Sequence, residues 1–227
     1  MTQKPLETIE IETGKLPQAS VIWLHGLGAD GNDFVPIVHE LTLQRAPEIR
    51  FVFPHAPMQP VTINNGYVMR AWYDIKFGDL EGRAKQADEH GVRASQAAIA
   101  ALVEREVERG ITIGRIVLAG FSQGGAIALQ TGLRYPEKLA GIMALSTYLP
   151  LAETLAAEAT AENRATPIFM AHGTQDGVVP YAMASRSKDV LVQHGYNVEW
   201  HEYAMPHSVC PEEIRDISGW IDRVLGS

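Results

Sequence analysis

The chain has 227 residues, of which 46% are hydrophobic and 20% charged, and its 19 basic against 27 acidic side chains give a formal net charge of −8. A chain of this length buries enough surface to fold without disulfides or bound metals. An acidic chain with no basic run repels phosphates, so we expect no nucleic-acid partner. The single cysteine, Cys210, excludes an intramolecular disulfide and a multi-cysteine zinc site.

Membrane and targeting segments are not expected. No window approaches ~18 consecutive apolar residues, so no segment is predicted to span a bilayer. Residues 1–14 alternate polar and apolar side chains and lack the apolar stretch that a signal peptide needs. Together with the single cysteine, these features predict a soluble cytoplasmic protein without stable membrane insertion.

Short apolar runs alternate along the chain with amphipathic stretches of helical length, which is typical of strand–helix units and a mostly parallel sheet. Strands are predicted at residues 20–24, 49–53, 116–119, 139–145, 167–171 and, nearer the sheet edge, 197–203. Helices are predicted at residues 92–107, 124–134, 181–194 and 211–225. No repeat or Gly/Ser linker divides the sequence, so we expect one α/β domain over residues 1–227, with helices on both faces of the sheet.

The segment of residues 54–90 breaks this alternation. It holds proline, glycine and aromatic residues without clear periodicity, and it is too long for a plain connection. Loops of this kind often carry binding function. Whether this one forms a mobile lid is left open.

A serine stands where a strand is predicted to turn into a helix. Residues 120–124 match Gly-x-Ser-x-Gly, the pattern of the nucleophile elbow in α/β-hydrolases. A tight turn presents the Ser122 hydroxyl away from the sheet, and flanking glycines avoid collisions with the adjoining strand and helix. The alternative is an ordinary strand–helix turn with an exposed serine.

A serine hydroxyl is a weak nucleophile near neutral pH and needs a base, which in turn needs an orienting acid. In this fold the three groups follow the chain order serine, acid, histidine. His207 is favoured as the base because it lies in a loop after a predicted strand, where catalytic groups gather in open sheets. Of the other histidines after Ser122, His172 precedes the acid candidates and so breaks the expected order, His194 is interpreted as a residue at a helix C-terminus, and His201 as a structural side chain within a strand.

The acid has two aspartate candidates between Ser122 and His207. Asp189 falls within a predicted helix and is interpreted as a solvated side chain. Asp176 comes directly after the strand at 167–171 and is favoured. Its role would be to hold the imidazole tautomer and to stabilise the imidazolium without taking the proton.

A tetrahedral oxyanion also needs hydrogen-bond donors. One is expected to be the backbone N–H of Gln123, the residue after the nucleophile. The second is expected from the glycine-rich loop of residues 25–31, where two glycines flank Leu27. The alternative for this loop is a plain turn, and His25 is interpreted as a residue that orders it.

With these residues in place, the chain resembles the small carboxylesterase and acyl-protein thioesterase family of α/β-hydrolases. The resemblance runs over nearly the whole length. Several motifs in family order are more specific than the elbow alone, and they cover residues 24–31, 70–74, 120–125, 145–150, 172–176, 179–180 and 207–210.

The resemblance implies hydrolysis of carboxylic esters or thioesters without cofactor or metal, through an acyl-enzyme. Carried over by position, it gives the nucleophile, acid, base and two oxyanion donors as Ser122, Asp176, His207, Leu27 and Gln123. It also implies that Trp72 and Tyr73 lie beside the acyl pocket, and the motif at 145–150 adds Tyr148. For Trp72 and Tyr73 the alternative is packing of two aromatic side chains under a long loop.

The main functional prediction is therefore a serine carboxylesterase acting on small ester or thioester substrates. A palmitoyl-protein thioesterase or a lysophospholipase with the same triad is the nearest alternative. A hydrolase-like domain that only binds ligands is the alternative outside the enzymes, and a homodimer is left open. The acyl-chain preference is expected to depend on the groove around residues 54–80 and 146–150.

Overall fold

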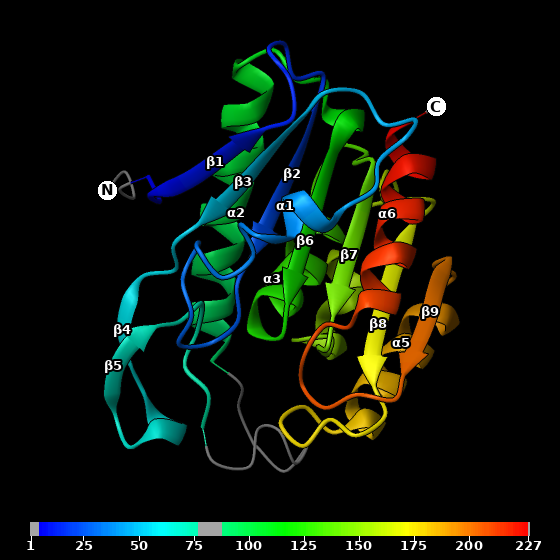
Figure 1. Ribbon diagram of the computed structural model, residues 1–227. Coiled ribbons are helices and arrows are strands. Elements are labelled where there is room, and N and C mark those ends of the chain that lie inside the picture. Colours follow the sequence, from blue (N-terminus) through cyan, green and yellow to red (C-terminus); the bar gives the residue numbers. More distant parts are fainter. Residues whose placement is uncertain (1–4, 77–87, 227) are drawn as a thin grey trace.

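A computed structural model describes residues 5–76 and 88–226. Its centre is a seven-stranded sheet in the order β1-β3-β2-β6-β7-β8-β9 (Figure 1). Every neighbouring pair is parallel except β1 and β3, which run antiparallel. The mostly parallel sheet predicted from the sequence is therefore confirmed.

The strands of this sheet are β1 (Thr8–Glu12), β2 (Ala19–Leu24), β3 (Ile49–Pro54), β6 (Ile116–Phe121), β7 (Gly141–Leu145), β8 (Ile168–Gly173) and β9 (Val198–Tyr203). The α-helices are α1 (Ile37–Glu40), α2 (Glu89–Glu108), α3 (Gln123–Gly132), α4 (Leu155–Glu158), α5 (Tyr181–Gln193) and α6 (Pro211–Leu225). Short 3₁₀ turns occur at Thr62–Asn64, Ile113–Arg115 and Ala152–Thr154. None of the helices in the described ranges combines the length and the apolar character that crossing a bilayer requires.

Helices cover both faces of the sheet (Figure 1) because both faces are apolar. On β2, Val21 and Trp23 join the core cluster that holds Trp220 of α6. Ile22 and Leu24, which point to the opposite face, join the cluster formed with α2 and α3. A strand that is fully buried on both sides reads as a continuous apolar run, which is why β2 was predictable.

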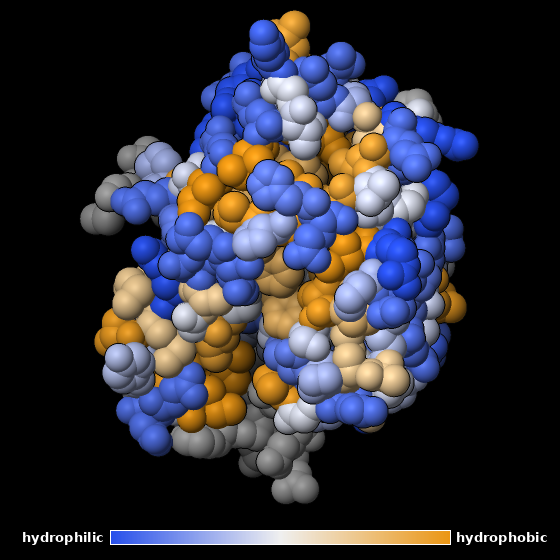
Figure 2. Space-filling model, viewed as in Figure 1, coloured by the Kyte–Doolittle hydropathy of each residue, from blue (hydrophilic) through white to orange (hydrophobic). Residues whose placement is uncertain are grey.

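The segment expected to be a long loop is partly ordered into a hairpin. Strands β4 (Met58–Val61) and β5 (Tyr67–Arg70) pair antiparallel and form a separate two-stranded sheet. The remainder of the expected loop at 77–87 lies outside the described residues. Hydrophobic side chains gather over this hairpin at the lower left of Figure 2, where Met58 and Val68 are more than half exposed.

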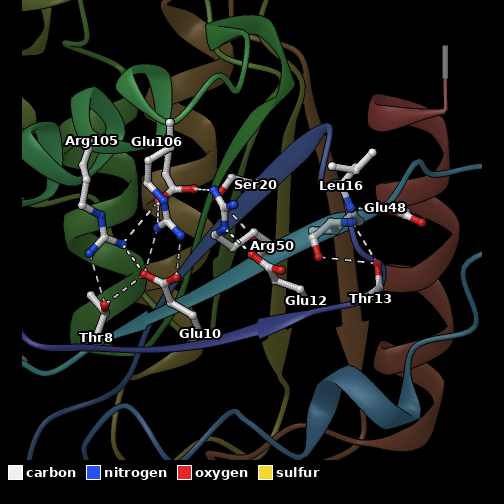
Figure 3. A network of polar contacts seen from close by, with 12 residues as sticks. Thr8, Glu10, Glu12, Thr13, Leu16, Ser20, Glu48, Arg50, Arg105 and Glu106 are labelled. Atoms are coloured by element: carbon white, nitrogen blue, oxygen red, sulfur yellow. Dashed lines mark hydrogen bonds and ion pairs between the residues drawn. The ribbon is translucent and has the colours of Figure 1, made fainter.

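A network of charged side chains attaches β1 to the rest of the sheet (Figure 3). Glu106 of α2 is completely buried, and its carboxylate pairs with Arg50 of β3 at 3.0 Å and with Arg109 at 2.9 Å. Arg105 and Arg109 reach on to Glu10 of β1 at 3.0 and 2.9 Å. One buried anion thus organises several arginines, because its charge is compensated only while they surround it.

Replacing Glu106 should therefore destabilise the folded state strongly. We expect Glu106→Ala to lower the free energy of unfolding by about 3–5 kcal/mol, because Arg50 keeps its buried charge without its inner partner. Glu12→Ala is the matched control, since Glu12 pairs with the same Arg50 from a side chain that is 38% exposed. It should cost under about 1 kcal/mol in urea unfolding. Equal losses for the two variants would contradict the central position given to Glu106.

Candidate active site

Ser122 lies at the sharp turn between β6 and α3. Its backbone has φ 54° and ψ −122°, a conformation that costs a non-glycine residue about 1–3 kcal/mol. Three hydrogen bonds hold this turn: the Ser122 N–H donates to the Leu145 carbonyl at 2.8 Å, and its own carbonyl accepts from Thr147 Oγ1 at 2.6 Å and from the Ala126 N–H at 3.1 Å. The strained conformation of Ser122 is thus fixed by hydrogen bonds to the end of β7, to Thr147 and to α3.

The glycines around Ser122 are required by contact distances. A Cβ on Gly120 would lie 2.4 Å from the backbone of Gly124. A Cβ on Gly124 would lie 2.4 Å from the Leu24 carbonyl oxygen at the end of β2. Real Cβ atoms essentially never approach a backbone atom so closely, so both positions need glycine. The glycine pattern that suggested the elbow therefore reflects the close approach of β6, α3 and β2.

Asp176 and His207 form a hydrogen-bonded pair at the same edge of the sheet. Asp176 follows β8 and His207 follows β9, and the carboxyl ends of these parallel strands meet where β6 ends (Figure 1). His207 Nδ1 lies 2.7 Å from Asp176 Oδ2. The other carboxylate oxygen accepts the N–H groups of Val178 and Val179 at 2.8 and 2.9 Å. A carboxylate only accepts, so the pair puts the proton on Nδ1 and leaves Nε2 free to act as a base.

The pair adjoins the serine turn through two contacts. The His207 ring packs against Phe121, the residue before Ser122, with 4.7 Å between ring centroids. Val178 and Val179, which bind the Asp176 carboxylate, line the same cavity as Ser122. The three side chains named from the sequence are therefore gathered at one rim of the sheet.

A cavity of about 170 Å³ opens beside Ser122. Its walls are mostly apolar, and they are formed by Leu27, Ile63, Asn64, Ile75, Ser122, Gln123, Tyr148, Val178 and Val179. Small-molecule sites are typically concave and apolar with a few placed polar groups, which is the character of this cavity.

The two expected oxyanion donors both belong to this cavity wall. Within the described ranges, the hydrogen bonds of the chain give neither the Leu27 N–H nor the Gln123 N–H an acceptor. The loop that carries Leu27 turns through Gly28, whose φ of +78° is strained for any residue with a Cβ, and the Gly28 N–H donates to the Arg70 carbonyl at 2.9 Å. Both amides are therefore without a backbone or side-chain acceptor among residues 5–76 and 88–226, as the expectation for oxyanion donors requires.

Trp72 and Tyr73 are buried beneath the site and are not part of its lining. The Trp72 indole donates to the His25 carbonyl at 2.9 Å, and the Trp72 N–H donates to the Gln123 side-chain oxygen at 2.8 Å. Gln123 in turn donates from Nε2 to the Tyr73 carbonyl at 2.7 Å. The aromatic segment therefore connects the Leu27 loop to the serine turn. Of the three predicted pocket residues, only Tyr148 lines the cavity, and its hydroxyl lies 2.7 Å from that of Tyr73.

His25 is a structural side chain of the Leu27 loop. Its Nε2 accepts the Ala56 N–H at 3.1 Å, so Nδ1 carries the proton toward the Gly26 carbonyl at 2.7 Å. Burial lowers the pKa of this imidazole, which keeps it neutral. Its position agrees with the interpretation of His25 as a residue that orders the loop.

Two of the histidines and the aspartate set aside in the sequence lie elsewhere. His194 caps α5 with Nδ1 2.8 Å from the Val190 carbonyl, and His201 stacks on Phe169 from β9. Asp189 is an exposed residue of α5 beside Lys188. Val178, Val179 and Ile75 were not named from the sequence as pocket residues, because single apolar residues in loops carry no pattern that marks them as a wall. No cluster of metal-ligating side chains occurs in residues 5–76 and 88–226.

Comparisons with known proteins agree with this geometry. A family model described as phospholipase/carboxylesterase matches residues 6–225. The chain is 43% identical to acyl-protein thioesterase 1 of Neurospora crassa, over 91% of this chain and 87% of that protein. It is 37% identical to the enzyme of the same name from Cryptococcus neoformans, over 97% of this chain and 98% of that one.

Solved structures give the same result. Arabidopsis thaliana SOBER1 matches with a TM-score of 0.83 at 32% identity, covering 91% of this chain and 99% of that one. Zea mays acyl-protein thioesterase 2 matches with a TM-score of 0.84 at 30% identity, covering 96% and 99%. The fold is thus that of an α/β-hydrolase. The chain belongs to the phospholipase/carboxylesterase family, and it is a hydrolase of ester or thioester bonds.

A buried acid lies just beyond the His207 loop. Glu213, in the first turn of α6, is completely buried, and neither carboxylate oxygen has a hydrogen-bond partner in the described parts of the chain. Burial raises the pKa of this carboxyl to about 8 from an ordinary value of 4.5. Between these two pH values the folded state binds a proton that the unfolded state has lost, so stability falls as the pH rises.

Glu213→Gln should remove this pH-dependent loss of stability. We expect the variant to gain about 3–5 kcal/mol of unfolding free energy relative to the parent protein between pH 5 and pH 9, measured by urea unfolding at each pH. Glu212→Gln, the exposed neighbour, should keep the parent's pH dependence. A Glu213→Gln variant whose stability falls with pH as steeply as the parent's would disprove the shifted titration.

Proposed function

We propose that Ser122, Asp176 and His207 form a catalytic triad that hydrolyses acyl esters and thioesters in two steps. The observation that supports this most directly is the 2.7 Å contact between Asp176 and His207 beside a serine held at positive φ. A nucleophile, a base and an orienting acid are the three roles that acyl transfer from a serine requires.

In the first step the Ser122 hydroxyl attacks the substrate carbonyl while His207 Nε2 accepts its proton. Asp176 stays ionised and stabilises the imidazolium through its hydrogen bond to Nδ1. The carbonyl oxygen becomes an oxyanion, which accepts hydrogen bonds from the Leu27 and Gln123 amides. The tetrahedral intermediate collapses, His207 returns the proton to the leaving alkoxide or thiolate, and the acyl group stays on Ser122.

In the second step water takes the place of the leaving group. His207 accepts a proton from the water as it attacks the acyl-enzyme, and the same two amides stabilise the second oxyanion. Collapse returns the proton to Ser122 Oγ and releases the carboxylic acid. No group other than the triad, the two amides and water has to take part.

For the substrate we propose an acylated protein or a related acyl thioester, with the acyl chain in the apolar cavity. Acyl-protein thioesterase is the activity named for the relatives from Neurospora crassa and Cryptococcus neoformans. Leu27, Ile63 and Ile75 supply an apolar wall that suits a hydrocarbon chain. Tyr148 would contact this chain, whereas Trp72 and Tyr73 would act from below by holding Gln123. A cytoplasmic location stays a prediction from the sequence, and a homodimer stays open.

Removing the nucleophile is the first test. Ser122→Ala should lower kcat for p-nitrophenyl acetate by about 10⁴-fold or more while the variant stays folded, because binding and oxyanion donors alone retain little catalysis. Ser185→Ala, a half-buried serine of α5, should leave kcat unchanged. A Ser122→Ala enzyme with most of its activity would exclude Ser122 as the nucleophile.

The cavity's role is tested by filling it. Ile63→Trp should lower kcat/KM for octanoyl and palmitoyl thioesters by at least about tenfold and leave the acetyl ester within about twofold, because only longer chains need the occupied volume. Val68→Trp places the same side chain on the exposed part of the hairpin and should leave the chain-length profile unchanged. A uniform loss across the ester series for Ile63→Trp would argue against the cavity as the acyl site.

A further inference from the structure

A second histidine lies directly beneath the Asp176–His207 pair. His172, the penultimate residue of β8, is completely buried. Its ring lies parallel to that of Trp200 within 10°, with 6.5 Å between centroids, and Tyr181 packs against it edge-on. These aromatic neighbours fix the plane of the imidazole, so the direction of its Nε2 is set by packing.

His172 Nε2 faces two acceptors of the loop that carries Asp176. It lies 2.9 Å from the Val179 carbonyl oxygen and 3.4 Å from Asp176 Oδ2, the oxygen that binds His207. Both neighbours only accept hydrogen bonds here, so Nε2 must be the protonated nitrogen. Burial lowers the pKa of this imidazole, which favours its neutral form.

The Val179 residue is consequently held through both of its backbone groups. Its N–H donates to Asp176 Oδ1 at 2.9 Å, and its carbonyl accepts from His172. The loop of residues 173–179 is thereby closed around the carboxylate. If the His172 donor were lost, the Val179 carbonyl and Asp176 Oδ2 would each lose a neighbouring N–H, and the orientation of the carboxylate would depend on the loop alone.

We propose that His172 is a positioning residue that holds the Asp176 carboxylate and the backbone of Val179 in the geometry that orients His207. The inference rests on the proposed triad and adds a fourth residue to it, one that acts only through Asp176. The essential feature is a neutral N–H at the place of Nε2. A reoriented Asp176 carboxylate would shift the His207 imidazole relative to the Ser122 hydroxyl. Misplacements of about 1 Å can cost about 10²-fold in rate.

Two variants of equal side-chain length separate the effect of the His172 N–H donor from the effect of the side chain's size. His172→Gln keeps an N–H at the position of Nε2, whereas His172→Met has none. We expect His172→Met to lower kcat for the acetyl ester by about 10- to 100-fold with KM within about threefold, and His172→Gln to restore most of that loss. The downfield proton resonance of the His207 Nδ1–H should weaken or shift in His172→Met and persist in His172→Gln.

Two controls keep the outcomes distinct. His201→Met, which removes an imidazole from the neighbouring strand β9, should leave both kcat and the His207 resonance as in the parent. A fluorophosphonate probe should label Ser122 in the parent protein, and failure to do so would contradict the triad itself. If Ser122 is labelled, but His172→Met keeps the parent kcat and resonance or His172→Gln falls as far as His172→Met, only the role of His172 is overturned.

Discussion

The structure depends on one backbone constraint, the positive φ of Ser122. A serine does not adopt this conformation unaided, and here the Leu145 carbonyl at the end of β7 and the hydroxyl of Thr147, just after β7, enforce it. The same turn brings Gly124 against the end of β2. Strand β2 leads into the Leu27 loop, so the turn that carries the Ser122 hydroxyl packs directly against the strand that carries this loop. The serine turn and the Leu27 loop are thus parts of a single packed junction.

The remaining site residues are arranged around this junction by hydrogen bonds of the backbone. Asp176 is oriented by two amides of its own loop, and Trp72 and Gln123 join the Leu27 loop to the serine turn. Groups fixed in this way need little reorganisation when charge develops, which is the main source of electrostatic catalysis. The cavity beside Ser122, by contrast, is bounded partly by Ile63 and Asn64, which lie between β4 and β5 outside the central sheet. Its wall therefore combines residues of the serine turn with residues of the separate hairpin.

Much of this arrangement could be predicted from the sequence. Buried parallel strands such as β2 and β6 are continuous apolar runs, and the residues that follow them are natural site candidates. That reasoning predicts Ser122, Asp176 and His207 at one edge of the sheet. The edge strand β1 was not predicted, because it pairs with β3 from a distant part of the sequence and its residues are only half-buried.

Other features could not be derived from local patterns. The hairpin of β4 and β5 pairs only with itself, so no core-facing periodicity marks it. The sequence suggested that Trp72 and Tyr73 border the acyl pocket, but it does not specify the direction of an indole or the partner of a glutamine amide. The part played by His172 is equally hidden, since it arises from the tertiary closure of the loop at 173–179.

The central claim is that the hydroxyl at the strained turn, the imidazole after β9 and two backbone amides converge on one carbonyl. A crystal structure of the fluorophosphonate adduct measures this directly. The account predicts phosphorus bonded to Ser122 Oγ, its oxygen about 2.7–3.1 Å from the N–H groups of Leu27 and Gln123, and His207 Nε2 facing the serine oxygen. Phosphorus on another side chain, or an adduct whose oxygen points away from both amides, would contradict it.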